Sequence, residues 1–156
     1  MTDAEKTDRD RVKLRLKARL AEYRDKALER RLLERELKDL EAQAGSLGSP
    51  NMDGMPRGSN TSDPTAREAV GSVTLQTLYR DRLALIITEQ TEVEQLIECL
   101  PIRERILMRL RYIKGRGWDE ICELMAYSWT HVHRIHSSAL NKLTDREMEE
   151  IYGQID

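Results

Sequence analysis

Phenylalanine is absent from this chain, and aromatic residues make up only 4% of its 156 positions. Charged residues, in contrast, account for 35%. A sequence this charged and this poor in aromatics lacks the apolar bulk for one large globular core. The composition therefore predicts an all-α protein built from long amphipathic helices and one compact module.

Cysteine and long apolar runs are also scarce. The two cysteines, Cys99 and Cys122, lie inside helical patterns and lack the spacing of a zinc site. They predict buried, reduced thiols in a cytoplasmic protein. No run approaches the ~18 apolar residues of a membrane span, and the charged N-terminus does not resemble a secretory signal. We therefore expect no membrane segment.

Glycine and proline are few, and they gather in residues 45–63, which predicts a linker between two long helices. The first helix is expected over residues 1–44. Its apolar seam is Leu16, Leu20, Tyr23 and Ala27, followed after a phase slip near Arg30 by Leu33, Leu37, Leu40 and Ala44. The second is expected over residues 64–99, with Asp63 as N-cap and Pro64 in the first position.

The seam of the second helix is predicted at Ala66, Val70, Val73, Thr77, Arg80, Ala84 and Ile87, continued after another slip by Val93, Ile97 and Leu100. A seam this narrow needs a partner helix. The two long helices therefore form either a hairpin within the chain or a coiled coil with a second copy, which would make a homodimer. The sequence does not choose between these arrangements.

Positive charge is concentrated in residues 101–143, which hold eight Lys/Arg against four Asp/Glu. Residues 100–143 contain two short helical patterns separated by a turn at Ala126 and Tyr127, with Ser128 as N-cap of the second. Two short helices joined by a tight turn are typical of a helix-turn-helix. Thr144 begins a capping-box pattern that predicts a separate acidic helix over residues 144–156.

All three histidines of the chain lie in the second helix of this module. At about 100° per residue, His131 and His133 diverge by about 160° and cannot share a metal ion. His136 falls on the inner face with Val132 and is predicted to be a core or core-edge imidazole with a hydrogen-bond partner. We therefore expect no metal and no cofactor. No nucleophile triad, phosphate loop or acid pair occurs at usable spacing, so we expect no catalytic residues and no enzyme.

The opposite side of the same helix, the outer face, carries Thr130, Arg134, Ser137 and Asn141. These side chains match the donors and acceptors of base edges and phosphates, and none is acidic. A merely solvated face, the alternative, would carry Glu and Lys in a chain so charged. The predicted contacts to double-stranded DNA are Trp129, Thr130, His133, Arg134, Ser137, Asn141 and Lys142, with Arg111, Lys114 and Arg116 as further phosphate contacts.

The string from Leu100 to Leu143 resembles region 4 of bacterial sigma factors, the helix-turn-helix that recognises the upstream promoter element. The register holds without a gap over 44 residues. The matching positions include Leu100, Pro101, Arg103, Glu104, Arg105, Tyr112, Glu120, Ser128, Val132 and Leu143. Two positions depart from the family pattern, since Ala126 stands where glycine is usual and His136 where a core leucine is usual.

The whole chain, including the GMPRGSN segment at Gly54–Asn60, resembles phage and prophage proteins near the late-gene transcriptional activators of the ArpU/RinA type. This resemblance implies a phage-encoded, sequence-specific DNA-binding regulator that acts with host RNA polymerase in the host cytoplasm, at the nucleoid. Nothing resembles sigma region 2, so a complete sigma factor is not expected. Two other classes stay open: a DNA-packaging recognition subunit similar to a small terminase, and a polymerase-binding interaction protein.

Overall fold

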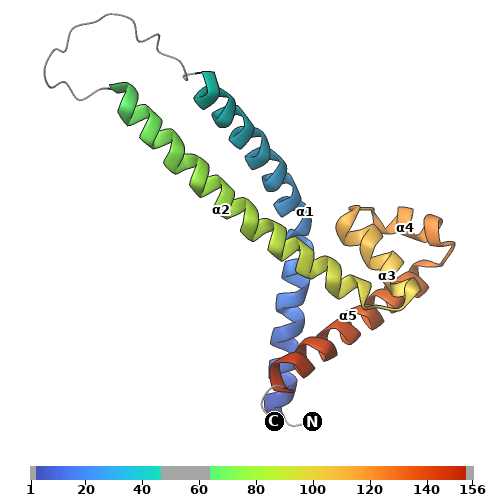
Figure 1. The fold of residues 1–156 in the computed structure, drawn as a ribbon. Coiled ribbons are helices and arrows are strands. Elements are labelled where there is room, and N and C mark those ends of the chain that lie inside the picture. Colours follow the sequence, from blue (N-terminus) through green and yellow to red (C-terminus); the bar gives the residue numbers. More distant parts are fainter. Residues whose placement is uncertain (1–2, 47–63, 154–156) are drawn as a thin grey trace, which may run out of the picture. The chain divides into compact units, whose positions relative to one another are not determined.

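The computed structural model describes residues 3–46 and 64–153, and the described residues are predominantly helical (Figure 1). The elements are α1 (Asp3–Ser46), α2 (Pro64–Glu98), α3 (Ile102–Met108), η1 (Arg109–Ile113), α4 (Trp118–Met125) and α5 (Trp129–Tyr152). The predicted all-α class, with a long N-terminal helix, is confirmed. The predicted linker lies outside the described residues except for Gly45 and Ser46, and so does the predicted cap Asp63.

The chain divides into two compact units, and both long helices contribute to each. The first unit comprises Met1–Ala27 with Glu89–Asp156, and the second comprises Leu28–Thr88. This division differs from the predicted domains, which separated each long helix as a whole from the helix-turn-helix. The first part of α1 and the last part of α2 belong instead to the same unit as the helix-turn-helix.

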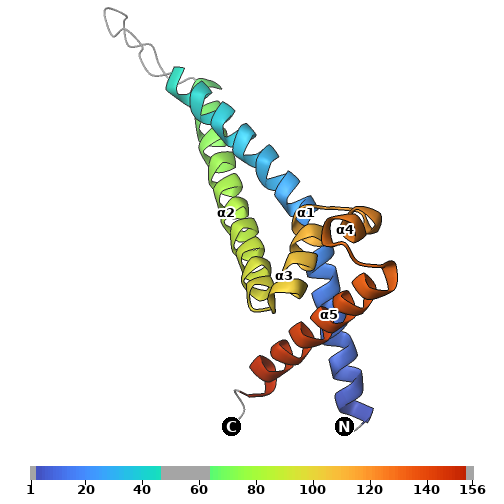
Figure 2. The same ribbon diagram turned by 90° about the vertical axis from the view of Figure 1, so that its right-hand side faces the viewer.

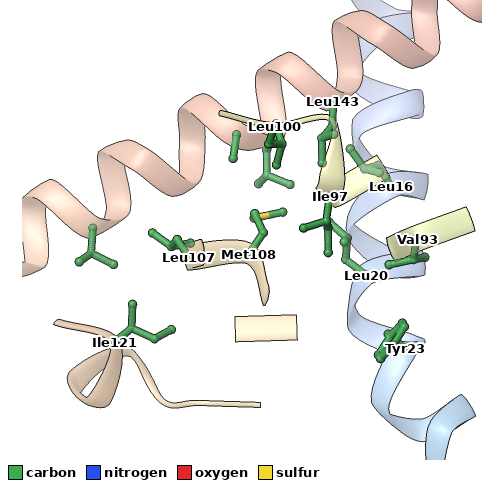
Figure 3. Packing of buried hydrophobic residues seen from close by; sticks show 13 residues of the cluster. Leu16, Leu20, Tyr23, Val93, Ile97, Leu100, Leu107, Met108, Ile121 and Leu143 are labelled. Carbon is green, nitrogen blue, oxygen red and sulfur yellow. The ribbon is translucent and has the colours of Figure 1, made fainter. Parts of the chain in front are cut away.

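One hydrophobic core holds the first unit together (Figure 3). Its buried members are Leu16, Leu20 and Tyr23 from α1, Val93 and Ile97 from α2, Leu100, Leu107 and Met108 around α3, Ile121 from α4, and Val132, Ala139, Leu140 and Leu143 from α5. Helix α5 crosses the N-terminal part of α1 in both views of the ribbon (Figures 1 and 2). Residues 16–23 of α1 therefore form part of the same core as the helix-turn-helix.

The second unit is a pairing of α1 with α2 inside one chain. Arg82 Nε lies 2.8 Å from Glu29 Oε1, and Arg80 Nη2 lies 2.6 Å from Glu41 Oε1. Leu83 is buried on the α2 side. These contacts form a helical hairpin, one of the two arrangements that the sequence left open.

The seam predicted for the start of α2 is wrong, because Val70 and Val73 are 67% and 61% exposed. The buried face follows an unbroken heptad spacing instead, through Gln76, Leu83, Ile86, Gln90, Val93, Ile97 and Leu100. Two glutamines occupy this seam, and Gln90 Nε2 donates to the Tyr23 carbonyl over 3.4 Å. The apolar residues alone therefore predict the wrong face at the start of α2.

The separate helix predicted over residues 144–156 is also wrong, because α5 runs without a break from Trp129 to Tyr152. Thr144 does not cap a new helix. Its hydroxyl is fully buried and donates to the Leu140 carbonyl over 2.7 Å. A threonine that bonds the carbonyl four residues back is compatible with an uninterrupted helix.

The two cysteines differ in exposure. Cys122 is partly buried, but Cys99 is exposed, so the expectation of two buried thiols fails for Cys99. In the described part of the chain, no helix has the length and apolar character needed to cross a bilayer.

Candidate nucleic-acid interface

The turn between α4 and α5 has the geometry that the sequence predicts. Ala126 adopts the left-handed conformation, with φ 54° and ψ 42°, and the Tyr127 N–H donates to the Cys122 carbonyl over 3.1 Å. Ser128 then begins α5, and its Oγ accepts a hydrogen bond from the His131 N–H over 3.3 Å. The turn and the cap fix the direction in which the first residues of α5 point.

The N-terminal half of the outer face is open to solvent. Thr130, Arg134 and Ser137 are exposed, while Val132 on the inner face is completely buried. Within the described residues, no side-chain hydrogen bond or ion pair engages Thr130, Arg134 or Ser137. Their donors and acceptors are therefore available to an external ligand.

The C-terminal half of the outer face is occupied by the protein itself. Lys13 Nζ of α1 donates to Asn141 Oδ1 over 2.8 Å. Lys142 Nζ lies 2.8 and 2.9 Å from the two carboxylate oxygens of Glu104. Glu104, only 7% exposed, also accepts from Ser138 Oγ over 2.7 Å. The structure therefore does not leave Asn141 and Lys142 as open as the sequence suggested.

Aromatic rings hold His133 in place. Its ring centroid lies 4.4 Å from that of Trp118 and 4.5 Å from that of Trp129. Its Nε2 is buried and has no hydrogen-bond partner. Trp129 packs on this ring yet is 52% exposed. It therefore stabilises the first turn of α5 and still exposes part of its indole to solvent. His133 lies inside this stack rather than projecting from the outer face.

His136 is the partly buried imidazole that the sequence predicts, with its Nε2 2.8 Å from Tyr112 Oη. Burial, followed by the nearby charges of His133, Lys17, Arg111 and Lys13, lowers the pKa of His136 to about 4. Burial also raises the pKa of Tyr112, so its hydroxyl keeps its proton. A neutral imidazole and a protonated phenol therefore share this hydrogen bond.

The candidate phosphate contacts before α4 differ in how much of their charge is neutralised. Arg111 stacks on Trp118, with its Cζ 4.6 Å from the ring centroid, and donates to the Arg116 carbonyl over 3.0 Å. Arg116 itself pairs with Glu120 over 3.1 Å. Lys114 is exposed, and no acid of the described chain pairs with it. Arg111 and Lys114 thus keep more of their positive charge than Arg116 does.

Three basic residues of α1 and one acid of α3 were missed as determinants of this surface. Lys13, Lys17 and Arg24 lie against the helix-turn-helix, and Glu104 binds Lys142. Helical spacing places the three basic residues on one flank of α1, but it does not reveal what that flank faces. Among the described residues, no group of three His, Cys, Asp or Glu side chains is placed to hold a metal ion.

Residues 96–145 match the family model for Sigma-70, region 4. Comparisons with curated proteins and with solved structures gave no match. The matched segment contains α3, η1, α4 and the first two thirds of α5, which together form the helix-turn-helix described above. The predicted sigma region 4-like helix-turn-helix, a DNA-binding class of module, is confirmed for this segment. Helix α1 and most of α2 lie outside it.

Proposed function

We propose that this protein is a phage-encoded transcription regulator that binds double-stranded DNA through α5 and activates late genes together with host RNA polymerase in the host cytoplasm. The observation that carries the DNA-binding part is the set Thr130, Arg134 and Ser137, which is open on the recognition helix of a sigma region 4-like module. The phage origin and the polymerase partnership rest on the resemblance of the whole chain to phage late activators.

Recognition would be led by Arg134, because a guanidinium can bond both O6 and N7 of a guanine in the major groove. Thr130 and Ser137 flank it on the same face and can bond base edges or phosphates. Trp129, with Arg111 and Lys114, would contact the sugar-phosphate backbone on either side. A direct contact from His133 would first require release from its aromatic stack, whereas Asn141, Lys142 and Arg116 have only part of their hydrogen-bonding groups engaged by partners in the chain.

The second unit supports a homodimer. Leu28 and Leu32 are exposed one helical turn apart on α1, and Leu78 and Leu85 are exposed two turns apart on α2. Exposed leucines repeated on one side of a helix are typical of a face that packs on another helix. A dimer would place two recognition helices on two half-sites. Sedimentation should therefore show a dimer for the full chain and a monomer for Leu28→Glu combined with Leu78→Glu.

The test of DNA recognition starts with DNA fragments selected from host and phage genomes by the full-length chain. Arg134→Ala should weaken binding to the selected site by roughly 1–3 kcal/mol, or about 5- to 150-fold, and relax the preference at one base pair. Binding to unrelated duplex should fall much less. Arg103→Ala is the matched control, because it removes an exposed arginine of the same unit from α3.

Unchanged affinity and selectivity in Arg134→Ala would show that the outer face does not read DNA. Capture of polymerase from DNA-free extract, without any DNA binding by the pure protein, would favour the polymerase-binding alternative. A ring of about eight or more copies would favour the packaging subunit instead.

A further inference from the structure

Helix α1 presents a row of positive charges to the helix-turn-helix, although α1 lies outside the segment that matches the sigma family. The row consists of Lys13, Lys17 and Arg24, called here the α1 basic flank. At about 100° per residue these three positions fall within about 40° of one another around the helix. They therefore share one side of α1.

The contacts of the α1 basic flank show that it lies beside the helix-turn-helix and meets the outer face at Asn141. Lys13 reaches Asn141 of α5 over 2.8 Å. Lys17 lies close enough to His136 to contribute to the lowering of its pKa. The guanidinium of Arg24 covers Gly115, where a Cβ atom would collide with it. The flank thus extends from the middle of α5 to the turn that precedes α4.

Among the residues that the structure describes, the α1 basic flank lacks the acidic partners that Arg19 and Lys26 have on the other side of the buried face of α1. Lys17 and Arg24 are exposed, and within the described ranges no acid pairs with either. On the other side of α1, Arg19 binds Glu147 over 2.7 Å and Lys26 binds Glu89 over 2.9 Å. Structural packing of α1 therefore accounts for the paired charges but not for the α1 basic flank.

We propose that the α1 basic flank is a second DNA-binding element, which contacts backbone phosphates beside the groove that α5 enters. This inference rests on the proposed DNA-binding function. Lysine and arginine contacts to phosphates supply affinity and fix the position of a protein on the duplex without reading sequence. The ammonium group of Lys13 has three N–H donors and donates one of them to Asn141, so it can bond a phosphate as well. Arg111 and Lys114 continue the positive surface toward α4.

The salt dependence of DNA binding tests this role. We would measure the affinity of the full-length chain for a random-sequence duplex by fluorescence anisotropy over a range of salt concentrations. For Lys17→Gln combined with Arg24→Gln, the slope of log K against log salt should become shallower by about 1.8, because each lost phosphate contact removes about 0.9. Relative to a reference at 1 M salt, this corresponds to a roughly 60-fold weaker affinity at about 0.1 M.

Two further variants make the test specific. Arg11→Gln with Arg15→Gln removes the same charge from the opposite flank of α1 and should leave the slope nearly unchanged. Lys17→Arg with Arg24→Lys keeps both charges and should retain the wild-type slope. If the double glutamine variant melts at a lower temperature than wild type, the single variant Lys17→Gln is measured instead, because Lys17 is exposed. Its slope of log K against log salt should become shallower by about 0.9.

The outcomes separate this inference from the proposed function. If wild type binds duplex and Arg134→Ala behaves as expected, but the glutamine variants keep the wild-type slope, the role of α1 is overturned alone. If wild type binds no duplex at all, both proposals fall. If the glutamine variants lose polymerase capture and keep DNA binding, the flank serves an acidic protein surface and the inference is wrong.

Discussion

His136 should make the stability of the first unit depend on pH below neutrality. Its pKa is about 4 in the folded protein, against roughly 6.5 in an unfolded chain. Between these values the unfolded state binds the proton more readily, so the unfolding free energy falls as pH falls through this window. Linkage gives a loss of about 2 kcal/mol between pH 7.5 and pH 5 from this one group.

Replacing His136 with leucine, the residue usual at this position of sigma region 4, removes the titrating group. At pH 7.5, His136→Leu loses the hydrogen bond to the Tyr112 hydroxyl, which costs about 1 kcal/mol and is partly offset by apolar burial. Between pH 7.5 and pH 5 the unfolding free energy of the variant should fall by about 2 kcal/mol less than that of wild type, because the variant has no imidazole to titrate at this position. Urea unfolding of both proteins at the two pH values, followed by circular dichroism, measures the difference.

Tyr112→Phe is the matched control for the hydrogen bond. It removes the hydroxyl but leaves the imidazole in its partly buried site, so most of the pH dependence should remain, since burial is the main cause of the lowered pKa. Equal losses of stability between pH 7.5 and pH 5 in wild type and His136→Leu would refute the reasoning, because the imidazole would then titrate alike in both states.

Two other substitutions test the local geometry of the helix-turn-helix. Ala126→Gly should raise the unfolding free energy by about 1 kcal/mol, because glycine adopts the left-handed conformation found at φ 54° without the penalty of a Cβ atom; a lower melting temperature would contradict this. Glu104→Gln should lower the unfolding free energy by about 1.5–3 kcal/mol, because the amide loses the charge-assisted bond to Lys142. The same variant should bind non-specific duplex more tightly, since Lys142 becomes free to bind phosphate; unchanged stability and binding would contradict the pairing.

The helix-turn-helix could be predicted from the sequence because its signals are local. The cap at Ser128 and the turn at Ala126 depend on neighbours within a few residues. The inner position of His136 follows from helical spacing relative to Val132. Such features need no knowledge of the rest of the fold.

The seams of the long helices could not be predicted from apolar residues alone, because polar side chains occupy part of them. Gln76 and Gln90 are buried on α2, and Lys26 and Arg30 are half-buried on α1. Each polar residue resembles a break in an apolar repeat, so the apolar pattern predicts two segments with a phase slip where the structure has an unbroken heptad. The buried face of each helix can be identified only when the position of its partner helix is known.

The availability of the outer face depends on contacts between distant residues. Asn141 is bonded by Lys13, 128 positions away, and Lys142 by Glu104, 38 positions away. No sequence pattern on α5 records either partner. Helical spacing therefore predicts which residues share the outer face, whereas the open part of that face is confined to its N-terminal half; contact of this face with DNA stays a prediction.

Helix α1 can influence DNA binding by two routes that experiment can separate. Leu16 and Leu20 are buried in the helix-turn-helix core, and Leu16→Ala should lower the unfolding free energy by about 2–5 kcal/mol. This is a large part of the ~5–15 kcal/mol that stabilises a typical domain. While the protein remains folded, however, Leu16→Ala should leave the salt slope unchanged, because no charge is removed. Lys17→Gln should do the reverse. A change in slope with Leu16→Ala would mean that the core position of α1, rather than its charge, controls contact with DNA.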